Sequence, residues 1–396
     1  MPSVTFDDRS FLVDGERIWL ASGSVHYFRL PQCAWRDRLL KARRAGLNCV
    51  STPVAWNLHE PREGQWDFED ERDLPAFVRV AEEMGLYVIL RAGPYVGCDL
   101  DFGGLPGWLA GKSGMTYRTN SAAFTHYIDK YCRQIGRLAD MQVTHGGNII
   151  LIQNEQDYVF TTMPDRLAYL EFVSQLFRRA GFEIPIITCN DFSEPALPEA
   201  VESVSAWGDE VRKLKRLMMF QPSAPPFVCE HRLGRADWWG GEHEDRTARE
   251  AARRALEILG CGAQYNSYMF AGGTNFGYSA GRRPLGEDRY VTTSYDLEAP
   301  IAEGGGLTEK YYLLRLVNLL ANHMGSFLST CFVEEPLVTV HDSTQVLNLT
   351  GTAGAWAVVT SNGRDEIDSA LVSLPSGREL RVPLEPIGAT AIPVNL

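Results

Sequence analysis

Short apolar segments alternate with amphipathic segments along most of this 396-residue chain. The apolar segments are typical of strands that are buried on both faces of a parallel sheet. The segments between them have the spacing of helices, and two of them are closed by Gly46 and Gly85. Eight strand–helix units over about 300 residues predict an α/β fold, the (β/α)8 or TIM barrel. The expected strands are 22–27, 47–52, 86–91, 149–152, 183–188, 201–206, 227–230 and 264–269, and the expected helices include 35–45, 74–84, 120–140, 164–180, 244–259 and 308–323.

The pattern differs at both ends of the chain. Residues 4–20 alternate apolar and polar side chains around Asp14-Gly15, which predicts a small β-ribbon with a hairpin turn. After residue 328 the helices stop, and short strand-like segments are separated by Gly, Asn and Asp turns. We therefore predict a barrel with its N-terminal ribbon over 1–327 and a small antiparallel β domain over 328–396. No flexible linker separates them, so we expect a short, packed junction.

Charge and cysteine usage restrict the partners and the compartment. A formal net charge of -12 argues against nucleic acid and anionic membranes as main partners. No signal peptide and no apolar run of membrane-spanning length are recognisable. The 8 cysteines are isolated along the chain, without the spacing of a zinc site, and Cys49 and Cys229 lie in strand patterns typical of free buried thiols. We expect a reducing cytoplasm.

Two of the predicted strands end in a glutamate. The fourth strand, IILI, is followed by Gln153, Asn154 and Glu155, and the seventh strand, FVC, is followed by Glu230. Carboxylates at the C-terminal ends of barrel strands are where such folds carry their chemistry, although each alone could be a structural partner of an arginine. A pair of carboxylates is what the hydrolysis of a glycosidic bond requires. The sequence does not fix the distance between them.

The chain resembles the glycoside hydrolases of family 35, the β-galactosidase family, over about residues 10–320. The motifs that carry this resemblance are WNLHEP at 56–61, GPY at 93–95 with DFGGLP at 101–106, QNE at 153–155, YMFAGGTNFG at 268–277 and TSYD at 293–296.

The resemblance implies a retaining exo-glycosidase that acts on a carbohydrate and uses no cofactor and no metal. Glu155 is similar to the family's general acid/base, Glu230 to its nucleophile and Asn154 to the residue that binds the 2-hydroxyl of the sugar. Tyr95 is either a wall or a contact of the sugar. Trp238 could stack on a sugar ring or pack in the core, and Asn275 could touch the ligand from a structural glycine loop.

Three departures from the family cluster on the side of the site that holds C3, C4 and C6 of a galactosyl ring. The family usually has Tyr where this chain has Pro53, Cys-Ala-Glu where it has Gly97, Cys98 and Asp99, and a second Tyr, two residues after Tyr295, where it has Leu297. Two lost phenol hydroxyls remove hydrogen bonds to a sugar, and buried polar contacts of this kind discriminate strongly. We therefore expect a sugar other than simple galactose, unless neighbouring loops replace these contacts.

Two other functions stay open. A transglycosylase would use the same covalent intermediate, and a non-catalytic carbohydrate-binding barrel would need neither an acid nor a nucleophile. The chain is short for the family, whose further β domains often wall the substrate entrance. A homo-oligomer in which a second subunit covers part of the mouth is therefore a possible assembly.

Overall fold

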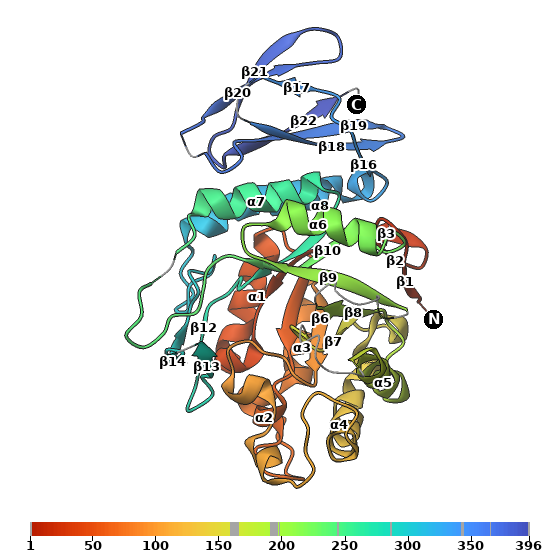
Figure 1. Cartoon of the computed structure of the whole chain (residues 1–396), viewed down its shortest axis with the longest axis vertical. Coiled ribbons are helices and arrows are strands. Elements are labelled where there is room, and N and C mark those ends of the chain that lie inside the picture. The colour runs from red at the N-terminus through yellow and green to blue at the C-terminus, as the bar shows by residue number, and fades with distance from the viewer. Residues whose placement is uncertain are drawn as a thin grey trace.

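The computed structural model describes residues 2–158, 166–190, 197, 199–243, 245–285, 287–341, 344–364 and 366–394. Its centre is a closed barrel of eight parallel strands (Figure 1), which confirms the predicted TIM barrel. The strands follow one another around the barrel in chain order, and the last closes onto the first. They are β4 (Ala21–Ser24), β5 (Cys49–Pro53), β6 (Tyr87–Gly93), β7 (Ile149–Asn154), β8 (Ile186–Cys189), β9 (Ala200–Ala206), β10 (Phe227–Arg232) and β11 (Gln264–Tyr268).

Helices connect the barrel strands and cover their outer faces. The α-helices are α1 (Trp35–Arg44), α2 (Trp56–His59), α3 (Leu74–Glu83), α4 (Ala122–Ile135), α5 (Arg166–Arg179), α6 (Glu210–Phe220), α7 (Ala248–Gly260) and α8 (Glu309–Leu328). Short 3-10 helices lie at η1 (Tyr27–Arg29), η2 (Gln32–Ala34), η3 (Asp70–Arg72), η4 (Asp101–Gly104), η5 (Gly107–Gly111), η6 (Gly136–Met141) and η7 (Val143–His145).

Helix α6 was not expected from the sequence. Its lysines and arginines obscure a narrow apolar stripe, of which Leu214 and Leu217 are buried. All six helices that the sequence predicted are present, with ends shifted by a few residues. The first residues expected in two of them, 164–165 and 244, lie outside the described residues.

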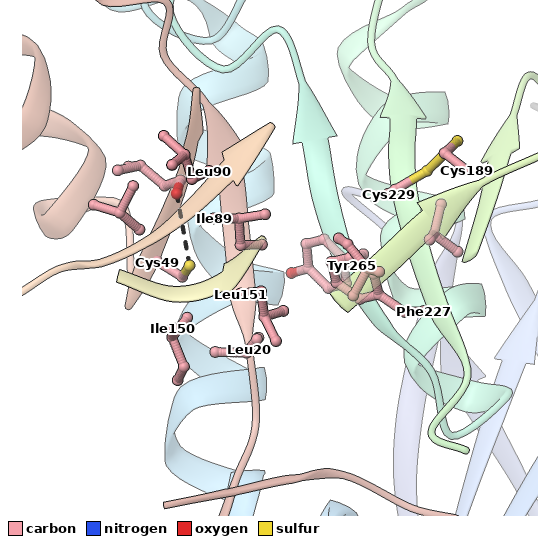
Figure 2. Close-up of a cluster of buried hydrophobic side chains, with 14 of the residues drawn as sticks. Leu20, Cys49, Ile89, Leu90, Ile150, Leu151, Cys189, Phe227, Cys229 and Tyr265 are labelled. Carbon is pink, nitrogen blue, oxygen red and sulfur yellow. Dashed lines mark hydrogen bonds between the residues drawn. A yellow bond between two sulfur atoms is a disulfide. The ribbon is translucent and has the colours of Figure 1, made fainter. Parts of the chain in front are cut away.

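The interior of the barrel is filled by large apolar side chains (Figure 2). Leu20, Ile89, Leu151 and Phe227 come from different strands or strand ends and are buried in one cluster. Tyr265 of β11 extends this cluster toward α8, where its hydroxyl donates to Asn318 Oδ1 at 2.6 Å. Full burial of each such side chain stabilises the fold by roughly 1.5–3 kcal/mol. These packed side chains lie below the polar residues at the C-terminal ends of the strands.

One predicted free thiol is paired. Cys229 of β10 forms a disulfide with Cys189 of β8, so the prediction of a free thiol at Cys229 is wrong, whereas Cys49 is free and buried as predicted. The two cysteines are 40 residues apart in sequence and come close only because the barrel curves β8 and β10 toward each other around β9. The sequence carries no signal for that proximity.

Additional sheets flank the barrel at both ends of the chain. Strands β1 (Val4–Phe6), β2 (Phe11–Val13) and β3 (Glu16–Ile18) form the predicted ribbon, and Asp14 and Gly15 both have positive φ, as a tight hairpin turn requires. Two short pairs lie in the loop after β11. They are β12 (Gly273–Thr274) with β15 (Ser294–Tyr295) and β13 (Arg282–Leu285) with β14 (Glu287–Tyr290).

The C-terminal residues form two antiparallel sheets, as predicted. One has the order β16 (Phe332–Glu334), β18 (Gln345–Gly351), β19 (Gly354–Thr360) and β22 (Ala389–Val394), and the other has β17 (Thr339–Val340), β20 (Ser369–Ser373) and β21 (Glu379–Pro383). Helices α7 and α8 lie between them and the barrel (Figure 1). The division into domains at residue 328 stays a prediction. Within the described ranges, no helix combines the length and the apolar character that a membrane span requires.

Candidate active site

A cavity of about 670 Å³ opens at the C-terminal end of the barrel. Its size suits a small ligand. Loops after β6, β7, β9, β10 and β11 wall it, and these segments are brought together only by closure of the barrel. The residues predicted from sequence that line it are Tyr95, Cys98, Asp99, Glu230 and Trp238.

Glu230 lies at the floor of this cavity and is only 3% exposed. Arg91 donates to its Oε1 at 2.9 Å, and Arg232 donates to its Oε2 from Nη2 at 2.9 Å and from Nε at 3.2 Å. Ser205 donates a further hydrogen bond to Oε2 at 3.0 Å. Both carboxylate oxygens are therefore held in fixed positions by charged or polar donors.

These partners decide the ionisation of Glu230. Burial raises the pKa of a carboxyl group, but the charges of Arg232 and Arg91 outweigh burial here and lower the pKa of Glu230. The group is consequently an anion over the ordinary range of pH. A buried, ionised and rigidly held carboxylate is suited to act as a nucleophile or to stabilise a positive charge.

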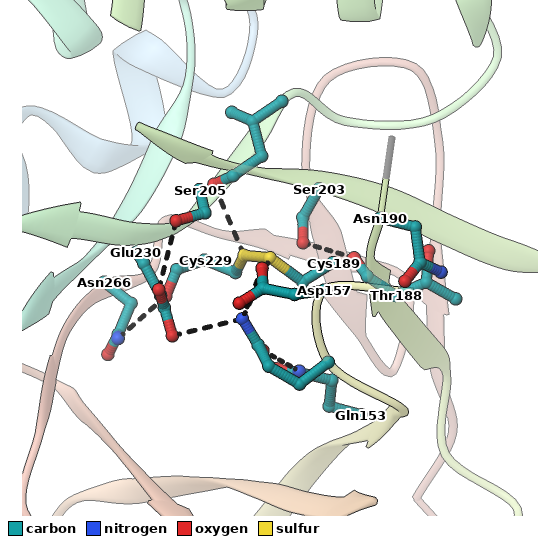
Figure 3. The surroundings of a disulfide bond; sticks show 12 residues. Gln153, Asp157, Thr188, Cys189, Asn190, Ser203, Ser205, Cys229, Glu230 and Asn266 are labelled. Carbon is teal, nitrogen blue, oxygen red and sulfur yellow. Dashed lines mark hydrogen bonds between the residues drawn. A yellow bond between two sulfur atoms is a disulfide. The ribbon is translucent and has the colours of Figure 1, made fainter. Parts of the chain in front are cut away.

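A second carboxylate, Asp157, lines the same cavity. Gln156 connects the two, because its Nε2 donates to Asp157 Oδ1 at 3.0 Å and to Glu230 Oε1 at 3.3 Å. Asp157 Oδ1 and Glu230 Oε1 are therefore both within hydrogen-bond distance of the same amide nitrogen (Figure 3). Burial raises the pKa of Asp157, and the negative charge of Glu230 raises it further. Neighbouring carboxyls with pKa values shifted in opposite directions are typical of acid–base pairs.

Glu155 has a different environment from the one that the sequence predicts. It follows β7 with a φ of 59° and is completely buried. Arg118 donates to its Oε2 at 2.7 and 3.0 Å, and the Tyr169 hydroxyl donates to its Oε1 at 2.6 Å. Its carboxylate is not among the groups that line the cavity, and Gln156 and Asp157 occupy the cavity wall after β7.

Asn154 also points away from the cavity. Its Nδ2 donates to the Leu170 carbonyl at 2.8 Å and to the Ser174 hydroxyl at 2.9 Å, both on α5. Side chains alternate along a strand, and in β7 Gln153 has the opposite direction, with its amide bonded to Gln156 at 2.7 Å. The structure thus does not bring Asn154 to the place where a sugar would lie.

Tyr295 and Asn275 lie behind the cavity wall. Tyr295 is buried and donates to Asp99 Oδ2 at 2.9 Å, so it orients a residue that does line the cavity. Asn275 accepts from Arg29 Nε at 2.8 Å and donates to the Thr292 carbonyl at 3.0 Å. Both are positioned to support the wall rather than to contact a ligand.

The departures from the family occupy different positions. Leu297 lines the cavity, with a φ of 52°, and Asp99 lines it with the same φ. Pro53 is buried at the end of β5 and is not part of the lining. Gly97 and Cys98 also line it, so every altered position except Pro53 changes the surface that a ligand would meet.

Arginines are the largest group of residues that the sequence analysis missed. Arg232 could have been found, because it follows Glu230 by two residues in one strand and so lies on the same face. Arg235 from a loop and Arg282 and Arg289 from the β13–β14 hairpin also line the cavity, but the sequence analysis predicted no element there. Within the described residues no cluster of His, Cys, Asp and Glu could hold a metal ion.

Comparisons by sequence find one family model and several relatives. The model of the glycosyl hydrolases family 35 matches residues 10–320. Human beta-galactosidase-1-like protein 2 is 37% identical over 313 residues, which cover 77% of this chain and 49% of that protein. Mouse beta-galactosidase is 36% identical over 316 residues, covering 78% of this chain and 48% of that protein. The chain thus spans about half the length of these relatives.

Among solved structures, the beta-galactosidase from Bacillus circulans sp. alkalophilus has the same fold. Its TM-score is 0.59 at 11% identity, and the match covers 78% of this chain and 57% of that one.

Proposed function

Because the chain belongs to the glycosyl hydrolases of family 35, we propose that it is a β-galactosidase-like exo-glycosidase that removes a terminal sugar with retention of configuration. The observation that carries the proposal is Glu230, an ionised carboxylate held between Arg91 and Arg232 at the floor of a sugar-sized cavity.

The proposed reaction has two displacements. In the first, a carboxylate oxygen of Glu230 attacks the anomeric carbon while an acid gives a proton to the departing glycosidic oxygen. A glycosyl ester forms and the aglycone leaves as an alcohol. In the second, the conjugate base of that acid takes a proton from water, whose oxygen attacks the anomeric carbon and releases Glu230. No cofactor is needed for this balance of atoms and protons.

Two residues compete for the role of the acid. The family resemblance favours Glu155, whose carboxylate would have to leave Arg118 and Tyr169 and turn toward the cavity. The geometry favours Asp157, which already lines the cavity beside Glu230 and has a raised pKa. An acid with a raised pKa is protonated when a leaving group needs its proton.

Parallel kinetics of Glu230→Gln, Glu155→Gln and Asp157→Asn test the proposal. Glu230→Gln should lose on the order of 10⁴-fold or more in kcat on aryl glycosides. The variant of the true acid should lose about 10²–10⁴-fold in kcat/KM on substrates with poor leaving groups but little on activated ones, whose first displacement needs no proton. Its second displacement lacks the base, and azide should rescue that step. If Glu230→Gln keeps its activity, the proposed nucleophile is wrong.

The other two functions are separated by the same experiments. Product analysis in the presence of an added sugar acceptor distinguishes hydrolysis from transglycosylation, which would leave few free sugars. A non-catalytic barrel would give no turnover with the wild type, while sugar binding would persist in both wild type and Glu230→Gln.

The identity of the sugar is proposed from Asp99 and Leu297, which both line the cavity at positions where the family usually has other residues. A panel of aryl β-galactoside, α-L-arabinopyranoside, β-glucoside, β-xyloside, β-glucosaminide and β-galactofuranoside measures the preference. We expect a sugar other than galactose to have the highest kcat/KM, and galactose as the best substrate would contradict this.

A further inference from the structure

One wall of the cavity is built from arginines. Arg232 and Arg235 come from the end of β10 and the loop after it, and Arg282 and Arg289 come from the β13–β14 hairpin. We call these four residues the arginine wall. The whole chain has a net charge of -12, so four cationic groups around one cavity are not a general property of its surface.

The backbone fixes the position of this wall. Gly281, which precedes the hairpin, donates to the Asp99 carbonyl at 2.7 Å, and Val291, which follows it, donates to the Gly281 carbonyl at 3.1 Å. On the other side, Trp239 donates to the Tyr290 carbonyl at 2.9 Å. The hairpin therefore joins two loops of the site, which holds its arginines over the cavity.

The acidic residues that line the cavity are fewer than its arginines. Asp99, Asp157 and Glu230 face four lining arginines, and Glu230 is in addition paired with Arg91 from below. Burial and the charge of Glu230 raise the pKa of Asp157, which favours its neutral form. Among the side chains that line the cavity, arginines therefore outnumber ionised carboxylates.

We propose that the arginine wall binds an acidic substituent, a carboxylate or a sulfate ester, of the sugar whose anomeric carbon lies at Glu230. This inference rests on the proposed glycosidase function and names its substrate class. Arginine presents several N–H donors in a plane that matches carboxylate and sulfate oxygens, and charge-assisted hydrogen bonds of this kind are among the strongest in proteins. Leu297 on the same cavity offers no hydroxyl for a neutral sugar.

Kinetics on matched pairs of substrates test the proposal. The aryl β-galactopyranoside is compared with its 6-carboxylate, the aryl β-galacturonide, and with its 6-sulfate, and the gluco series is compared in the same way. We expect kcat/KM to be on the order of tenfold or more higher for at least one acidic member of a pair. The better of the carboxylate and the sulfate identifies the substituent. This preference should shrink as ionic strength rises, because salt screens exposed charges.

Variants of the arginine wall show whether it causes the preference for acidic over neutral substrates. Arg289→Gln and Arg235→Gln should lower the ratio of acidic to neutral kcat/KM about tenfold. Arg133→Gln on α4, whose side chain is 74% exposed and paired with Asp129, is the matched control and should leave the ratio unchanged. A neutral substrate that is preferred in the wild type, or a ratio that neither wall variant changes, overturns the proposal and leaves the glycosidase function intact.

Measurements of sugar binding distinguish a failure of the arginine-wall proposal from a failure of the proposed glycosidase function. Calorimetry with free galacturonate, galactose 6-sulfate and galactose requires no turnover. Arginine-dependent binding of the acidic sugars by a wild type that hydrolyses none of the aryl glycosides would support the wall and overturn the glycosidase. Loss of both turnover and binding would overturn both.

Discussion

Glu230 depends on its two arginines for its charge. A buried carboxyl without them would have a raised pKa, and it is Arg232 and Arg91 that lower it. Because a nucleophile must be ionised, the acid limb of activity should follow this pKa and lie below the usual glutamate value of about 4.3. As pH falls through the pKa of the folded state, Glu230 gains a proton and both its ion pairs and its reactivity are lost.

Arg232→Gln should therefore raise the apparent pKa on the acid side of the pH profile of kcat/KM. Removing one of two cations should increase the apparent pKa of kcat/KM by about one unit, since an adjacent opposite charge lowers a carboxyl pKa by roughly one to three units. The pH dependence of kcat/KM measures this, with Arg133→Gln as control. An unchanged acid limb would mean that Glu230 does not control it.

The hydroxyl of Tyr169 holds Glu155 in its buried position. Tyr169→Phe removes a hydrogen bond of 2.6 Å to a fully buried carboxylate, which should lower the free energy of unfolding by about 1–3 kcal/mol. Urea denaturation measures the change, and Tyr312→Phe, at an exposed tyrosine of α8, is the control. No change in stability would indicate that Glu155 does not need this partner and is available to turn toward the cavity.

At the scale of elements, the loop after β10 and the loop that contains Leu297 are packed backbone to backbone. A Cβ at Gly234 would lie 2.0 Å from the Leu297 carbonyl oxygen, and both residues line the cavity. The glycine is required by this close approach rather than by its conformation.

Gly234→Ala should push the two loops apart. We expect a loss of about 1–3 kcal/mol in the free energy of unfolding, as for other overpacked sites, together with a KM raised severalfold. Gly107→Ala, where a Cβ meets nothing within 4 Å, is the matched control. Thermal unfolding and steady-state kinetics measure both effects. An alanine that changes neither stability nor KM would contradict the proposed close packing.

At the scale of the whole molecule, the disulfide ties β8 to β10 directly before Glu230 in the chain (Figure 3). The prediction of a reducing cytoplasm relied on free cysteines, and disulfides persist mainly in oxidising compartments. The disulfide therefore removes part of the support for that prediction. A homo-oligomer stays a prediction, which light scattering can test.

A count of free thiols tests the pairing. Six cysteines are free, namely Cys33, Cys49, Cys98, Cys132, Cys261 and Cys331. Titration of the denatured, unreduced protein with a thiol reagent should therefore give six equivalents, and titration after reduction should give eight. Peptide mapping should assign the additional two to Cys189 and Cys229. Eight equivalents before reduction would contradict the disulfide.

The sequence by itself determined the barrel, the order of its strands and the positions of Glu155 directly after β7 and of Glu230 near the end of β10. These follow from local patterns, because the burial of each strand and the amphipathic face of each helix are written in consecutive residues. The overlooked helix α6 shows the limit of that signal, since a stripe of two buried leucines is hidden among charged neighbours.

Only the tertiary structure decided which side chains meet in the cavity. Asn154 and Glu155 turn toward α5, Arg118 and Tyr169, and Asp157 lines the cavity beside Glu230. The arginine wall and the Cys189–Cys229 disulfide likewise join segments far apart in the chain. The direction of a side chain at a strand end depends on the local backbone angles and on partners supplied by distant loops. Neither is encoded in the spacing of residues, so closure of the barrel had to decide them.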